Sequence, residues 1–185
     1  MAASSPPPHA PASPRWLTPG RALGALLLLF LLLRLLQALT STHSFDDEEG
    51  YTLTAAFELL HHDVWPYQAY QLSDWENGSR VVVWVAAALA SVFGPALFVL
   101  KLTAILFSCA LLTALFLLVS SVAGTRAGLL AGLLYVFFPE PVFQYSMTAH
   151  GFHTDSVFLQ LLFFWRLMRV LQGARRLRDL LLCGL

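Results

Sequence analysis

Four consecutive acidic residues, Asp46 to Glu49, stand between two strongly apolar stretches of this chain. Carboxylates at the start of a helix cap its free N–H groups and complement its dipole, which is worth from a few tenths to about 1 kcal/mol each. Neighbouring carboxylates also suit proton transfer, because like charges raise the pKa of a carboxyl group toward the range useful for abstraction. Capping needs fewer than four acids, so a structural and a chemical interpretation both stay open.

A second polar group, His150, His153 and Asp155, stands at the start of another apolar stretch. In one interpretation the histidines lie at a membrane interface and Asp155 caps a helix. In the other, Asp155 faces the same cavity as Asp47, because an ionisable group in a membrane segment is costly unless it is used. The His-x-x-His spacing with Asp155 would also suit a metal, but three candidate ligands alone are a weak signal. We therefore expect neither a metal nor another cofactor.

The composition is that of an integral membrane protein. The chain has 185 residues, of which 57% are hydrophobic and 12% charged, and its mean hydropathy is +0.66. Since a spanning helix needs about 20 residues, the apolar runs predict an all-α, polytopic transmembrane helical bundle. The expected segments are 21–40, 80–94, 96–122, 126–147 and 150–171. A further apolar run, 179–185, ends before it is long enough to span, so we expect the chain to be the N-terminal part of a longer protein, with 21–185 as its membrane domain.

Charge distribution predicts the orientation. Residues 1–40 carry three arginines and no acid, whereas residues 41–80 carry eight acids and one arginine. Five arginines cluster between positions 166 and 178, and Arg and Lys accumulate in cytoplasmic loops. The sequence thus predicts a cytoplasmic N-terminus, an external loop at 41–79 and a multi-pass protein of the bacterial inner membrane. An even number of crossings must then separate the loop from the start of the last segment, so either 80–94 or 126–147 does not cross.

The sequences on the two sides of the first apolar segment each predict a structure. Residues 1–20, rich in Pro, Ala and Ser, should form a disordered cytoplasmic leader, although residues 22–39 could instead be a signal-peptide core. In the loop, an amphipathic helix should run from Asp47 to about His62 along the membrane surface. Its apolar residues are Tyr51, Leu53, Ala56, Phe57 and Leu60.

The order of these parts carries a family resemblance. Asp47-Glu48-Glu49-Gly50-Tyr51, directly after the first apolar segment, resembles the Asp-Glu-x-x-Tyr signature of GT-C-type glycosyltransferases that use polyprenyl-phosphate sugars. Protein O-mannosyltransferases and lipid A aminoarabinose transferases belong to that branch. The resemblance covers residues 21 to about 172, and the later landmarks follow in the family's order: Trp65-Pro66, Phe93-Gly94-Pro95, Lys101-Leu102 and Asp155.

The resemblance implies a set of site residues. Asp47, with Glu48 beside it, would be the general base that deprotonates the acceptor as the acceptor attacks the sugar's anomeric carbon. Asp46 competes for that role and otherwise helps to bind the acceptor. The expected substrate-binding residues are Asp46, Tyr51, Arg80, His153 and Asp155. Arg80 would meet the charge of the departing phosphate, although the Pro-Pro that follows the corresponding Lys in relatives is missing here.

Two functions follow from these observations. The first is a membrane glycosyltransferase whose partners are the bilayer, a lipid-linked sugar donor and a glycan, lipid or protein acceptor, without nucleic acid. The second is a non-enzymatic polytopic protein, such as a transporter half or an assembly factor. Transporters place their acids near the bilayer midplane, whereas the densest acids here lie in a predicted external loop, which favours the enzyme. Arg34, within the first segment, is expected to snorkel to the membrane surface, and Cys109 and Cys183 should not form a disulfide.

Overall fold

The computed structural model describes residues 18–40, 47–61, 80–138, 144, 146–149 and 154–173. Within these ranges the regular secondary structure is entirely helical, which confirms the predicted all-α class. The helices are α1 (Pro19–Thr40), α2 (Asp47–His61), α4 (Arg80–Phe93), α5 (Leu97–Ala123), α6 (Thr125–Val136) and α8 (Thr154–Leu171). Most of the expected leader and parts of the 41–79 loop lie outside the described residues, although Pro19 and Gly20 already belong to α1.

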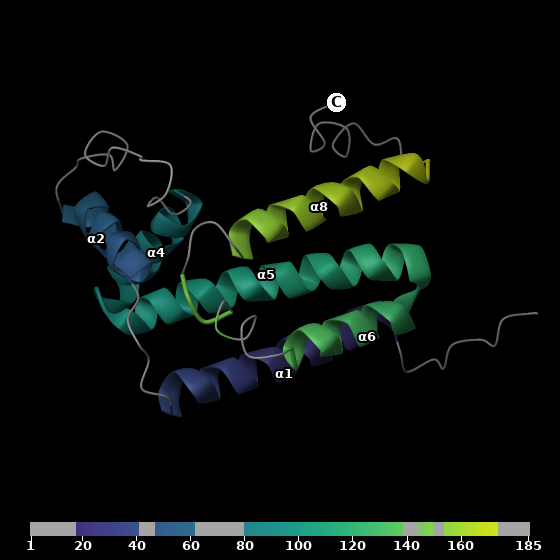
Figure 1. Cartoon of the computed structure of the whole chain (residues 1–185), viewed down its shortest axis with the longest axis horizontal. Coiled ribbons are helices and arrows are strands. Elements are labelled where there is room, and N and C mark those ends of the chain that lie inside the picture. The colour runs from purple at the N-terminus through teal and green to yellow at the C-terminus, as the bar shows by residue number, and fades with distance from the viewer. Residues whose placement is uncertain are drawn as a thin grey trace, which may run out of the picture.

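Helix α5 is the centre of the arrangement. Helices α1, α6 and α8 run lengthwise beside it, whereas α2 and α4 gather around its N-terminal end (Figure 1). α5 and α6 form an antiparallel pair joined at Gly124, whose φ of 85° lies in the left-handed region that favours glycine. The C-terminal ends of α1 and α6 and the N-terminal ends of α5 and α8 all point toward the end that holds α2 and α4 (Figure 1).

One apolar cluster joins α1, α5 and α6. Its buried members include Leu26 and Phe30 of α1, Leu112 and Phe116 of α5, and Val136 of α6. Small residues on α6 let the three helices approach closely, because Gly128 lies against Phe116 and Ser120, and Gly132 lies against Leu26 and Leu112. A Cβ atom at position 132 would come within 2.5 Å of Leu26 Cδ1, so this contact requires glycine or a shift of the leucine.

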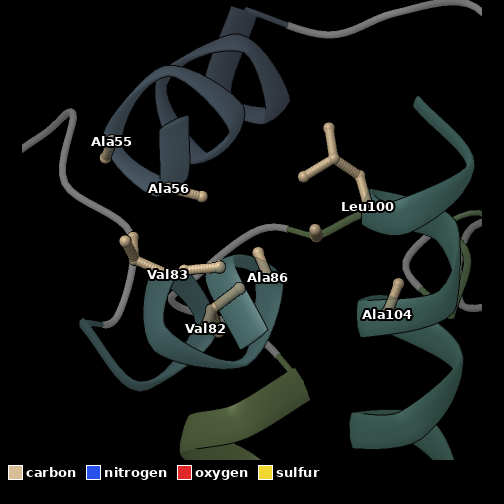
Figure 2. Close-up of a cluster of buried hydrophobic side chains, with 9 residues drawn as sticks. Ala55, Ala56, Val82, Val83, Ala86, Leu100 and Ala104 are labelled. Carbon is tan, nitrogen blue, oxygen red and sulfur yellow. The ribbon is translucent and has the colours of Figure 1, made fainter. Parts of the chain in front are cut away.

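A second cluster joins α2, α4 and the start of α5. Figure 2 shows the labelled members, with α4 seen end-on beside α5 seen from the side, so that the two helices cross steeply. The members are small or β-branched apart from one leucine: Ala55, Ala56, Val82, Val83, Ala86, Ala87, Leu100, Ala104 and Ala149. α4 therefore packs across the end of the bundle rather than along it.

Two element boundaries differ from the expected ones. Helix α6 ends at Val136, eleven residues before the predicted end of the 126–147 segment. The sequence continues Pro139-Glu140-Pro141, and proline lacks the N–H donor and clashes with the preceding turn. Helix α8 begins at Thr154 instead of 150. The described helices α6 and α8 are thus shorter than the segments that hydropathy predicted, the first at its C-terminal end and the second at its N-terminal end.

Two of the described helices, α1 and α5, are long and apolar enough to cross a membrane. Helices α4 and α6 are apolar but have 14 and 12 residues, or about 21 and 18 Å at 1.5 Å per residue. Length and composition thus suggest a membrane protein without fixing the number of crossings.

Arg34 does not extend its side chain to the surface as expected. It is only 2% exposed and its guanidinium carbon lies 5.0 Å from the ring centre of Phe30, one turn earlier on α1. The snorkelling prediction was wrong, because α1 turns this face toward α5 and α6 and the arginine is enclosed there.

Candidate functional site

The last of the four consecutive acids, Glu49, is fully buried and ion-paired. Lys101 Nζ on α5 donates to both carboxylate oxygens of Glu49, at 2.8 Å to Oε1 and 2.9 Å to Oε2. Both residues are shielded from solvent, with exposures of 0% for Glu49 and 6% for Lys101. Charges this deeply buried are normally paired in this way, because an isolated one would be too costly.

Helix α2 also forms hydrogen bonds with the backbone of Ala149. The Ala149 N–H donates to Glu49 Oε1 at 3.2 Å, and Thr52 Oγ1 donates to the Ala149 carbonyl at 3.4 Å. Glu49 and Thr52 are three residues apart and so lie on one face of the helix. Both polar groups of a buried, non-helical residue are thereby satisfied by α2, as buried backbone groups require.

The predicted apolar face of α2 is only partly the packed one. Leu53 and Ala56 pack against the α2–α4–α5 cluster as expected. Tyr51, Phe57 and Leu60 remain 44%, 41% and 38% exposed. The packed face of α2 thus consists of a charged residue, a hydroxyl-bearing residue and small apolar residues. The aromatic residues of α2 lie on its outer surface.

Asp155, in the first turn of α8, is buried. Its exposure is 3%, and its Oδ1 has no hydrogen-bond partner among the described residues. An acid in the first turn interacts favourably with the helix dipole, but capping does not require the carboxylate to be enclosed. Burial of a partly unsatisfied carboxyl group is costly, so such a group in a folded protein calls for a specific explanation, for example a functional role.

A second polar contact lies two turns further along α5. Ser108 Oγ donates to the Ser146 carbonyl at 3.2 Å. Lys101 and Ser108 are seven residues apart, so they share one face of α5. The segment 146–149 therefore lies along this face, with Ser146 at Ser108 and Ala149 at the Glu49–Lys101 pair.

The predicted site residues fall into three groups: those whose side chains the structure does not describe, those that are exposed, and one that is buried. Asp47 and Glu48 belong to the first turn of α2, but their side chains, like the residues Asp46 and His153, lie outside the described part. Tyr51 is on the exposed side of α2.

Arg80 is the exposed first residue of α4, and Asp155 is the buried acid of α8. The structure links the helix of Asp47 to the chain that leads into Asp155, because Ala149 is held by α2 and stands six residues before that acid.

Glu49 and Lys101 were not among the predicted site residues, although both stood in quoted landmarks. A signal for Lys101 was present: it is the sole lysine of the chain and it lies inside a 27-residue apolar helix. A lone charge in such a helix requires a partner, and the nearest large supply of carboxylates is the 46–49 run.

Among the described residues, no three His, Cys, Asp or Glu side chains gather closely enough to hold an ion, while the candidate ligands His150 and His153 lie outside the described part. Cys109 is a half-buried free thiol, and Cys183 lies outside the described part.

Comparisons with protein-family models, curated proteins and solved structures found no match to this chain.

Proposed function

We propose that this chain is a membrane glycosyltransferase, or the N-terminal part of one, that moves a sugar from a polyprenyl phosphate to a glycan, lipid or protein acceptor on the external face. One observation carries the proposal most directly. The acidic start of α2 is held against the segment that leads into the buried acid of α8. A transferase of this kind requires acids from separate parts of the sequence to meet beside the membrane.

In this proposal Asp47 is the base. Its carboxylate accepts the proton of the acceptor hydroxyl or amine while the acceptor's oxygen or nitrogen bonds to the anomeric carbon. The bond between that carbon and the phosphate oxygen breaks, and polyprenyl phosphate leaves with the electron pair. Glu48 assists in binding the acceptor, Asp155 binds the sugar from α8, and Arg80 stabilises the departing phosphate.

The membrane topology that goes with this function has four crossings, by α1, α5, α6 and α8. In this scheme α4 lies across the external end, since it packs on α2 and on the start of α5. Four crossings put the N-terminus and the arginine-rich segment after α8 on the same, cytoplasmic side. They also leave an even number of crossings between the 41–79 loop and the start of α8, because 80–94 becomes the apolar run that does not cross.

The short length of α6 is compatible with a crossing. Ser146, Met147 and Ala149, which follow α6 in the chain, are buried against α5 and α2. Non-helical backbone is tolerated at membrane depth where it is enclosed by protein, so in this scheme the helix and this buried segment together complete the span.

The proposal is tested by reconstituting the complete protein in liposomes with radiolabelled polyprenyl-phosphate hexoses and pentoses. We expect one donor to lose its sugar to an acceptor in a protein-dependent reaction that proceeds in EDTA. If no donor is consumed while the protein remains folded, the non-enzymatic alternative, a transporter half or an assembly factor, replaces the enzyme.

A further inference from the structure

We propose that the Glu49–Lys101 ion pair is a positioning device that sets the placement of the α2 N-terminus relative to the α8 N-terminus. The catalytic part of this proposal rests on the proposed function, because the groups that the ion pair positions are Asp47 and Glu48 on α2 and Asp155 on α8. Its structural part is independent of any activity. Neither Glu49 nor Lys101 is assigned a chemical step.

Three separate elements meet at one carboxylate. Glu49 comes from α2, Lys101 from the start of α5, and the Ala149 N–H from the segment before α8. Oε1 accepts from both Lys101 and Ala149, so a movement of α2 along its axis would break both hydrogen bonds together. Thr52 adds a second contact to Ala149 one turn later, which fixes the rotation of α2 about its axis.

The other contacts of α2 do not supply this precision. Its packed residues include Ala55 and Ala56, which face Val82, Val83 and Ala86 of α4 (Figure 2). Contacts between small apolar side chains are non-directional and would allow α2 to slide by part of a turn. Hydrogen bonds require a defined distance and angle, so the bonds of Glu49 to Lys101 and to the Ala149 N–H favour one position of α2.

Net stability does not explain the pair. Replacing a buried ion pair by well-packed apolar residues is often neutral or stabilising, and the best-attested use of buried polar groups is to specify register. The Glu49 carboxylate immediately follows Asp47 and Glu48 on the same helix, so a register set at Glu49 is transmitted directly to both.

The structural part is tested by electron–electron distance measurements in the complete protein. Spin labels are placed at the exposed positions Thr54 on α2 and Val157 on α8, with Cys109 and Cys183 replaced by alanine. We expect one narrow distance distribution, which broadens or shifts in Lys101→Met and is restored in Lys101→Arg. Thr113→Val is the matched control on α5, because the Thr113 hydroxyl donates to the Cys109 carbonyl of its own helix.

The catalytic part is tested by steady-state transfer in the same variants. Misplacement of reacting groups by about 1 Å can reduce a rate about 100-fold, so Lys101→Met should lose at least tenfold in kcat with a smaller change in donor KM. Lys101→Arg should recover most of the loss. If Lys101→Met does not fold, Glu49→Gln, which keeps the shape but removes the charge, replaces it in both measurements.

The outcomes separate the two proposals. An unchanged distance distribution in a folded Lys101→Met or Glu49→Gln variant overturns the positioning device, whatever the activity. A changed distribution with unchanged kcat overturns its catalytic part. A wild-type protein without transferase activity overturns the proposed function, while the distance measurement still decides the structural claim.

Discussion

Glu49 is completely buried together with its charge. A carboxylate and an ammonium group removed from water each lose favourable hydration, and their mutual attraction restores it only with good geometry. Lys101 supplies that geometry with contacts of 2.8 and 2.9 Å to the two oxygens. Removing one partner leaves the other charge buried alone, whereas removing both avoids that cost.

This contrast gives a prediction for stability. Lys101→Met should lower the free energy of unfolding by about 3–5 kcal/mol, because it leaves Glu49 without its counter-ion. The double variant Glu49→Leu/Lys101→Met should be less destabilised than Lys101→Met alone, although Ala149 loses an acceptor worth about 1–3 kcal/mol. Thermal unfolding in detergent micelles measures both. Additive losses in the double variant would mean that the two residues do not interact.

Asp155 gives a second prediction at this scale, since its burial suggests that function outweighs stability there. Asp155→Asn preserves the shape and removes a buried charge, so the melting temperature should stay the same or rise. Sugar transfer should fall by about 10- to 100-fold, as expected when a contact of about 1–3 kcal/mol to a bound sugar is lost. A lower melting temperature with unchanged transfer would show that Asp155 is only a cap of α8.

Helix α6 depends on two glycines for its packing, and the chain offers a matched control on α1. A Cβ at Gly128 would overlap Ser120 Oγ and come 3.0 Å from the Phe116 carbonyl oxygen, which is backbone and cannot rotate away. Gly24 on α1 has nothing within 4 Å of that position. We expect Gly128→Ala to destabilise the protein and Gly24→Ala to stabilise it by about 0.5–1 kcal/mol through helix propensity. Equal effects in thermal unfolding would refute the close α5–α6 contact.

At the scale of elements, sequence patterns located all of the described helices but not all of their ends. The predicted 21–40 and 96–122 segments match α1 and α5 within two residues, because their apolar runs stop where the helices stop. The predicted 126–147 segment is longer than the described helix α6, which ends at Val136, three residues before Pro139. The inner face of α2 was only half predicted, since periodicity weights apolar residues and here Glu49 and Thr52 occupy part of that face.

The long-range contacts of the site were the part that the sequence could not predict. The partners of Glu49 stand 52 and 100 positions away, and local spacing carries no information on such contacts. The lone lysine in α5 indicated that a partner must exist, but only the packing of α2 across the end of α5 identifies which of the four acids it is. The proposed meeting of Asp47 with Asp155 stays a prediction.

The arrangement of the whole molecule leads to a topology prediction. Single cysteines at Ser73 and Ala96 should react with an impermeant thiol reagent from the external side, because α4 lies across that end. A cysteine at Gln172 should react only from the cytoplasmic side, as should one at Ala123, since the Gln172 side chain contacts the Ser121 carbonyl at 3.3 Å. The native cysteines are replaced beforehand. Labelling of Ala96 from the cytoplasmic side would mean that α4 crosses the membrane.

The proton chemistry of Asp47 is the central claim, and a pair of neighbouring substitutions tests it most directly. Losing a helix cap costs about 0.5–2 kcal/mol, whereas losing a general base typically reduces the rate 10²- to 10⁴-fold. Asp47→Asn remains a good helix-starting residue but cannot accept a proton, and Asp46→Asn serves as the control one position away. In reconstituted complete protein, we predict that Asp47→Asn abolishes transfer from the polyprenyl-phosphate sugar at normal membrane expression, while Asp46→Asn retains most of it. Near-wild-type transfer in Asp47→Asn, or loss in Asp46→Asn alone, would contradict this assignment.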